Sequence, residues 1–102
     1  MYQDLAVSSA YKWFKDNVDL FRSKSSEMEF KDSGSGLAYV RVDTVDFMSE
    51  LNIKDKGFRL EIERIDRNTH ETSFPYTGEC ETLAEFEKCL AEFIEWFEAA
   101  HA

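Results

Sequence analysis

The middle of the chain, residues 37–66, alternates apolar and polar side chains at a period of two. The clearest example is GFRLEIERID, residues 57–66. Its two faces are Phe58, Leu60 and Ile62 on one side and Arg59, Glu61 and Glu63 on the other. Because successive side chains of a strand point to opposite faces, this pattern predicts strands with one apolar and one charged face. Such strands build a sheet that is covered on one side only.

Other segments extend this sheet to four or five strands. They are EMEFKD (27–32), LAYVRVDTV (37–45), DFMSELNIK (46–54) and ETSFPYT (71–77). The short polar turns SGSG, KDKG and DRNT between them indicate antiparallel hairpins. In the last segment we expect Thr72, Phe74 and Tyr76 to oppose Ser73 and Pro75. Proline cannot donate a backbone hydrogen bond to a neighbour, so this segment is expected at a sheet edge.

A helical period of three to four flanks the sheet at both ends. Residues from Ser9 to Phe21 predict an amphipathic helix, with Ser8 or Ser9 as its N-cap. Thr82 and Glu85 form a T-x-x-E capping box that opens the last helix. The apolar stripe of that helix is Leu83, Phe86, Leu90, Phe93, Ile94 and Phe97. The predicted fold class is therefore α+β, a single domain over residues 1–102, with both helices on the apolar face of an antiparallel meander.

The charge balance narrows the classes of partner. The formal net charge is −9, with 21 Asp and Glu residues against 12 Lys and Arg residues. This disfavours direct binding to nucleic acid or to anionic membranes, both of which need cationic side chains. It favours a basic protein partner, or one that normally holds nucleic acid. No apolar run is long enough to cross a membrane and no export signal is visible, so we expect a cytoplasmic protein with reduced cysteines.

The residues that carry catalytic chemistry do not form a recognisable constellation. His70 falls in a polar turn, and His101 is penultimate, where we expect the chain to fray. Cys89 falls at the margin of the helical stripe, as a small packing residue. Glu61 and Glu63 are expected to be exposed to water on an open sheet, where nothing distinguishes one as an acid and the other as a base. We therefore expect no enzyme activity, no cofactor and no metal site.

The charged face of the sheet is the candidate site. There, acidic residues are mixed with Tyr39, Met48 and Ile65, which is typical of docking patches. Trp96, one position off the helical stripe, is either a packing residue or an exposed anchor for a partner. The predicted partner-binding residues are Tyr39, Asp43, Met48, Glu50, Arg59, Glu61, Glu63 and Trp96. The alternative surface is the last helix, because residues 79–98 hold seven glutamates against one lysine.

The layout resembles a known class of proteins. The segments that carry the resemblance are YKWFKDN, GFRLEIERIDRNT and TLAEFEKCLAEFIEWF. Together they are similar to the small acidic immunity proteins of bacterial polymorphic-toxin systems, and to the TriTu-type family among them. Such families often carry an Asp-x-x-Thr-Gly-Glu hairpin, and here DRNTHE has His70 in place of the glycine. The resemblance implies a protein that binds and blocks a toxin domain.

The resulting hypothesis is an immunity protein, a monomer or weak homodimer, that occludes a basic cleft on its cognate toxin. Two rival classes remain open. One is another acidic inhibitor or chaperone, such as a phage-encoded nucleic-acid mimic or a secretion chaperone. The other is a small enzyme or ligand carrier with a cleft near His70.

Overall fold

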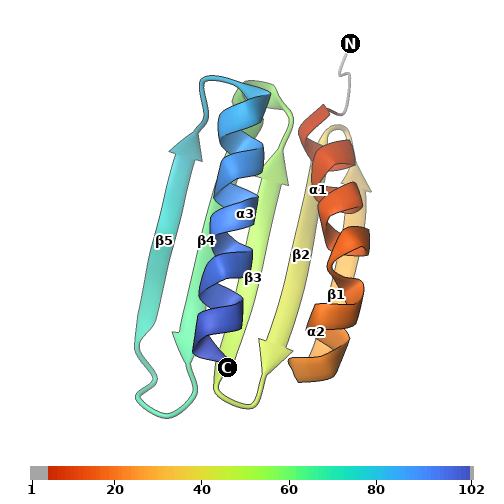
Figure 1. Ribbon diagram of the computed structural model, residues 1–102. Helices are drawn as coiled ribbons and strands as arrows, with labels where there is room; N and C mark the ends of the chain where they lie inside the picture. Colours follow the sequence, from red (N-terminus) through yellow and green to blue (C-terminus); the bar gives the residue numbers. More distant parts are fainter. Residues whose placement is uncertain (1–4, 102) are drawn as a thin grey trace.

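The computed structural model describes residues 5–101 and has the α+β architecture that the sequence predicts (Figure 1). Two helices come first, a five-stranded sheet follows, and one long helix closes the chain. The elements are α1 (Leu5–Asp16), α2 (Val18–Lys24), β1 (Ser25–Gly34), β2 (Leu37–Thr44), β3 (Phe47–Lys54), the 3₁₀ turn η1 (Lys56–Phe58), β4 (Arg59–Asp66), β5 (Thr72–Glu79) and α3 (Leu83–Ala100).

The sheet is an antiparallel meander in which each strand pairs with the next along the chain, in the order β1-β2-β3-β4-β5. All three helices lie on one face of it: α1 and α2 on the β1–β2 side, and α3 along β3 and β4 (Figure 1). No helix of residues 5–101 lies on the opposite face. This confirms the expected covering of a single side.

The core lies between the sheet and the helices. The strands contribute the buried residues Ala38, Val40, Val42, Leu51, Ile53, Leu60 and Ile62. The helices contribute Ala6, Val7, Ala10, Phe21, Phe86, Leu90, Phe93 and Phe97. Each buried side chain of this size contributes roughly 1.5–3 kcal/mol relative to exposure. The predicted stripe of the last helix thus faces the core, and Leu83 and Ile94 pack at its margin.

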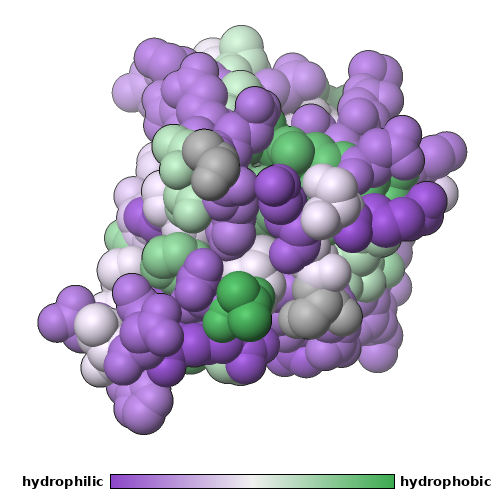
Figure 2. Space-filling view, turned by 60° about the horizontal axis from the view of Figure 1, so that its bottom comes forward, coloured by the Kyte–Doolittle hydropathy of each residue, from purple (hydrophilic) through white to green (hydrophobic). Residues whose placement is uncertain are grey.

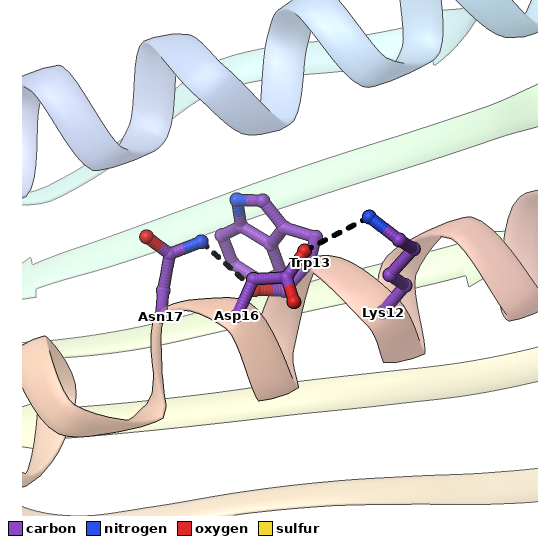
Figure 3. A network of polar contacts seen from close by, with 4 residues as sticks. All are labelled: Lys12, Trp13, Asp16 and Asn17. Carbon is purple, nitrogen blue, oxygen red and sulfur yellow. Dashed lines mark hydrogen bonds and ion pairs between the residues drawn. The ribbon is translucent and has the colours of Figure 1, made fainter.

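The N-terminal helix differs from the prediction. It begins at Leu5, so Ser8 and Ser9 lie inside α1 and neither is its N-cap. It also breaks at Asn17, whose backbone leaves helical geometry (φ −111°, ψ 11°) before α2 begins. The Asn17 side-chain amide donates to the Trp13 carbonyl at 2.8 Å, a local bond that competes with helix continuation (Figure 3).

A residue far away in the sequence holds the start of α1. Asp55, in the turn after β3, is buried, and its Oδ1 accepts the backbone N–H groups of Ala6 and Val7 at 2.6 and 3.0 Å. The first N–H groups of a helix have no partner within the helix, and a carboxylate also complements the positive end of the helix dipole. Asp55 therefore ties α1 to the sheet.

The ends of α3 are fixed by side chains. Thr82 Oγ1 accepts the Glu85 N–H at 3.2 Å, as the predicted capping box requires, and the Glu85 carboxylate accepts the N–H of Glu81. At the other end His101 is ordered and not frayed, contrary to the prediction. Its Nδ1 bonds the Phe97 carbonyl at 2.9 Å and its Nε2 bonds Thr44 Oγ1 at 2.8 Å, which joins the chain end to the end of β2.

β5 forms a sheet edge, as its proline predicts. The expected alternation along it is wrong, because a bulge lies opposite β4. Thr72 pairs with Ile65 and Tyr76 pairs with Ile62, so Thr72 and Tyr76 point to opposite faces of the sheet. An extra residue in one strand reverses the faces of all residues beyond it.

Candidate interaction surface

The sheet face that points away from the helices, here called the outer face, is built by strand register. Its residues are Glu27, Glu29 and Lys31 of β1, Leu37, Tyr39, Arg41 and Asp43 of β2, Met48, Glu50, Asn52 and Lys54 of β3, Arg59, Glu61, Glu63 and Ile65 of β4, and Thr72, Thr77 and Glu79 of β5. All seven predicted sheet residues lie on this face. Sequence alternation was sufficient to place them together, because register in an antiparallel meander follows from the buried face.

The pairings arrange the charges in rows across the strands. One row runs Glu29, Arg41, Glu50, Glu63, and the next runs Lys31, Tyr39, Asn52, Glu61. A third row holds Glu27, Asp43, Met48 and Ile65. These three rows carry six carboxylates against two cations, whereas the row nearest the β3–β4 turn carries Lys54 and Arg59 against Glu79. The outer face therefore has an acidic field with a weakly basic margin.

Glu50 and Glu63 stand directly opposite each other on adjacent strands. Like charges in this position destabilise a sheet by roughly 0.2–1 kcal/mol. Within residues 5–101, neither of them nor Glu61 forms an ion pair, and the ion pairs Lys12–Asp16 and Arg22–Asp19 lie on the helices. These three carboxylates, Glu50, Glu61 and Glu63, are therefore not neutralised by salt bridges within this part of the chain.

Apolar groups interrupt the acidic field. Met48 is 36% exposed, and it lies in the same row as Ile65. A shallow hollow of about 30 Å³ beside them is lined by Arg41, Asp43, Met48, Ser49, Glu50, Glu63 and Ile65. Tyr39 is half-buried and its hydroxyl reaches the Glu29 carboxylate at 3.4 Å.

Two predicted site residues do not fit this surface. Asp43 belongs to the outer face by register, but it is only 5% exposed and offers little surface to a partner. Trp96 lies on the helix side of the sheet and packs edge-on against Phe47, with ring centroids 5.3 Å apart. It is a half-buried packing residue of α3 and does not share a face with the other seven.

The glutamates of α3 form a second acidic surface, because Glu85, Glu87, Glu92, Glu95 and Glu98 are all exposed. They lie on the helix side of the sheet, so the two acidic surfaces point away from each other (Figure 1). Glu79 and Glu81 precede α3, and Glu79 belongs to the outer face because it pairs with Arg59. Around the end with the β2–β3 and β4–β5 turns the surface is mostly hydrophilic, with small, separate apolar patches (Figure 2).

The turn DRNTHE is well formed. Asp66 Oδ1 accepts the N–H groups of Asn68 and Thr69, and the His70 N–H donates to the Asp66 carbonyl at 2.7 Å. His70 has a positive φ of 62°, a conformation that glycine adopts without steric cost. Its side chain is exposed.

The two cysteines are free thiols on the helix side. Cys80 is buried, and its Sγ lies 3.1 Å from the Tyr76 hydroxyl. Burial, followed by the proximity of Cys80, raises the pKa of the Cys89 thiol to about 11. The hydrogen bond with Cys80, together with burial, raises the pKa of Tyr76 above its usual range. A thiol with a raised pKa is a poor nucleophile at neutral pH, so these groups are more suited to packing than to catalysis.

A groove that was not predicted from the sequence lies between α3 and β4–β5. Arg64, on the helix side of β4, places its guanidinium 4.0 Å from the centre of the Trp96 ring. Burial lowers the pKa of Arg64. The sequence feature that could have indicated this groove is Arg64 itself, a charged residue at a position of β4 that faces the helices. It pairs with the buried Ser49 of β3.

A further hollow of about 170 Å³ lies between α1 and α3. Trp13 enters it from α1 and donates through Nε1 to the Leu90 carbonyl at 3.1 Å. Lys12 and Asp16 form an ion pair at 3.1 Å on the rim (Figure 3). The Trp13–Leu90 hydrogen bond thus joins the two helices, whereas the ion pair lies within α1.

Among residues 5–101, no three His, Cys, Asp or Glu side chains stand close enough to share a metal ion. None of the helices in the same part of the chain has the length and apolar composition needed to cross a membrane. Comparison with known proteins gives no matching family model, and no significant match among curated proteins or solved structures.

Proposed function

We propose that this protein is an immunity protein that binds a cognate bacterial toxin domain through the outer face and blocks a basic cleft on it. The observation that carries the proposal is the helix-free acidic field of the outer face, in which Glu50, Glu61 and Glu63 have no ion-pair partners within residues 5–101. A cationic partner would supply the missing counter-charges.

The chemistry of the interface follows from this surface. The carboxylates attract a basic partner over a distance of about 8–10 Å at moderate salt, which raises the association rate. Tyr39 and Met48 supply apolar contact area inside the acidic field, which slows dissociation. The like-charged pair Glu50–Glu63 is relieved when a lysine or arginine of the partner lies between the two carboxylates.

The distribution of apolar surface favours this class over a secretion chaperone, which would dimerise through one large apolar patch. The exposed large apolar residues lie on different elements: Leu5 and Tyr11 on α1, Leu37 on β2, Val45 in the following turn, Met48 on β3 and Phe74 on β5. Small separate patches are normal for a soluble surface.

The test is protection against a toxin. The C-terminal domain of a large reading frame beside the gene is expressed in bacteria, with and without this protein. We expect growth arrest by the domain alone and growth in the presence of the wild-type protein. The Glu61→Lys, Glu63→Lys double variant is expected to lose protection while remaining folded.

The matched control is Glu95→Lys, Glu98→Lys on α3, which changes the net charge equally on the opposite side of the molecule. This variant should still protect. If the Glu61→Lys, Glu63→Lys variant still protects and the Glu95→Lys, Glu98→Lys variant does not, the toxin binds at α3 and not at the outer face. A neighbouring domain that arrests growth equally with and without the protein would contradict the proposed role.

A further inference from the structure

Two cavities on the helix side of the sheet share Arg64 and Trp96. The first, about 120 Å³, is mostly apolar and is lined by Ile62, Arg64, Pro75, Tyr76, Cys89, Glu92, Phe93 and Trp96. The second, about 250 Å³, is more polar and is lined by Phe47, Arg64, Asp66, Glu71, Thr72, Ser73 and Trp96. We call the two together the Arg64–Trp96 groove. It lies on the far side of the sheet from the outer face.

Arg64 has donors to spare in this groove. Its Nε is buried and has no hydrogen-bond partner among the described residues. It forms no ion pair within residues 5–101, although the chain has 21 acidic residues. A buried donor without an acceptor is costly, and native proteins usually satisfy it. The Arg64 Nε–H, which has no acceptor among the described residues, therefore points to an acceptor that comes from outside this part of the chain.

The stacking of Arg64 selects the shape of that acceptor. The Trp96 ring covers one face of the guanidinium at 4.0 Å, and so holds its plane in a fixed orientation. The N–H groups of a guanidinium lie in its plane and match the two oxygens of a carboxylate. Ser73, which pairs with Arg64 on the helix side of the sheet, lines the same cavity and adds a hydroxyl group.

Three acidic residues, Asp66, Glu71 and Glu92, also line the groove. Asp66 Oδ1 accepts two N–H groups of its own turn, and Glu71 and Glu92 are exposed to water. The apolar walls next to Arg64, Ile62 and Phe93 among them, suit an apolar body attached to the carboxylate. For scale, a dry cavity of about 150 Å³ is large enough for benzene.

We propose that the Arg64–Trp96 groove binds an apolar monocarboxylate of about the size of 3-phenylpropionate, with the carboxylate on Arg64 and the apolar group between β5 and α3. This chemistry is shared by a free aromatic acid and by a peptide chain end whose last residue is aromatic. The inference does not depend on the proposed function, since the outer face takes no part in it.

The experiment is a titration of the ¹⁵N-labelled full-length protein, followed at its two tryptophan indole N–H signals. The probe is 3-phenylpropionate and the matched uncharged probe is 3-phenylpropionamide. We expect the acid to shift the Trp96 signal saturably, with a dissociation constant of about 1 mM. The Trp13 signal serves as an internal reference, because its Nε1 is bonded to Leu90 on another side of α3.

The variants separate the site from non-specific binding. Arg64→Gln should raise the dissociation constant of 3-phenylpropionate at least tenfold. Arg59→Gln, on the outer face of the same strand, should leave this dissociation constant unchanged. Arg64→Lys keeps the charge but loses the planar fork, and should also bind more weakly.

Two outcomes would overturn the proposal. One is no saturable Trp96 shift at up to about 20 mM acid, roughly twenty times the expected constant. The other is an equal response to the acid and the amide in the wild-type protein, which is decisive even if a variant fails to fold. A tripeptide that ends in Phe, tested as the free acid and as the amide, then identifies the source of the ligand. If the peptide acid binds more tightly than 3-phenylpropionate, the groove binds a peptide chain end. If the peptide acid binds more weakly, the groove binds a free aromatic acid.

Discussion

Removing the carboxylate of Asp55 tests how the N-terminal helices are held on the sheet. In the folded protein one oxygen of Asp55 accepts two backbone N–H groups, from Ala6 at 2.6 Å and Val7 at 3.0 Å. Asp55→Ala leaves both donors without this acceptor in a buried place. Asp55 has helical backbone angles (φ −64°, ψ −39°), so alanine fits without strain.

The magnitude follows from the contacts. Loss of a helix cap costs about 0.5–2 kcal/mol, and a hydrogen bond to a charged group contributes about 1.5–3 kcal/mol. Because Asp55 Oδ1 accepts two such bonds, we expect Asp55→Ala to lower the free energy of unfolding by about 2–4 kcal/mol. The whole domain has a free energy of unfolding of about 5–15 kcal/mol, so the variant folds but is much less stable.

Urea unfolding followed by tryptophan fluorescence measures this loss. With a slope of about 1–3 kcal/mol per molar urea, the midpoint should fall by about 1–3 M. Asp55→Asn keeps an acceptor oxygen, so its urea midpoint should fall less than that of Asp55→Ala. Asp32→Ala is the control, because Asp32 is exposed and accepts only the nearby Gly34 N–H. An Asp55→Ala midpoint equal to that of Asp32→Ala would refute the idea that Asp55 anchors α1.

Two further predictions concern single side chains. Because the folded pKa of Cys89 is raised to about 11, the stability associated with its neutral thiol is present below the unfolded thiol pKa and is lost as pH rises towards 11. Urea midpoints measured from pH 8 to pH 11 should therefore fall, and Cys89→Ala should reduce the fall; identical pH profiles would contradict this origin. Separately, His70→Gly should raise the free energy of unfolding by about 0.5–1 kcal/mol, because it relieves the positive φ of 62°, offset in part by the greater freedom of glycine in the unfolded chain. A destabilised His70→Gly variant in thermal unfolding would show that the His70 side chain makes a contact that matters more than its backbone strain.

The sequence predicted those features that depend on local pattern. Period-two alternation located the strands and placed Glu50, Glu61 and Glu63 on one face, and the capping box located the start of α3. Such features depend on neighbours within a few residues, which a sequence displays directly.

The missed features depend on contacts between distant residues. Asp55 holds α1 from 49 positions away, and His101 is ordered by Thr44, 57 positions away. Neither partner can be identified from spacing along the chain. The break at Asn17 and the bulge of β5 opposite Glu63, between the pairs of Ile62 and Arg64, are local irregularities within otherwise regular patterns. The groove was missed because Arg64 was counted only as a charge, and its stacking on Trp96 appears only in three dimensions.

The acidic outer face is tested most directly by the salt dependence of association with a toxin domain of the proposed kind, once the protection test has identified one. The rate constant is measured by stopped flow at several ionic strengths for the wild type, the Glu61→Lys, Glu63→Lys variant and the Glu95→Lys, Glu98→Lys variant. We predict that the wild type and the helix variant associate fast at low salt and slow steeply as salt is added, whereas the sheet variant is slow throughout with a shallower slope. If the sheet variant matches the wild type at every ionic strength, the outer face is not the surface that meets the partner.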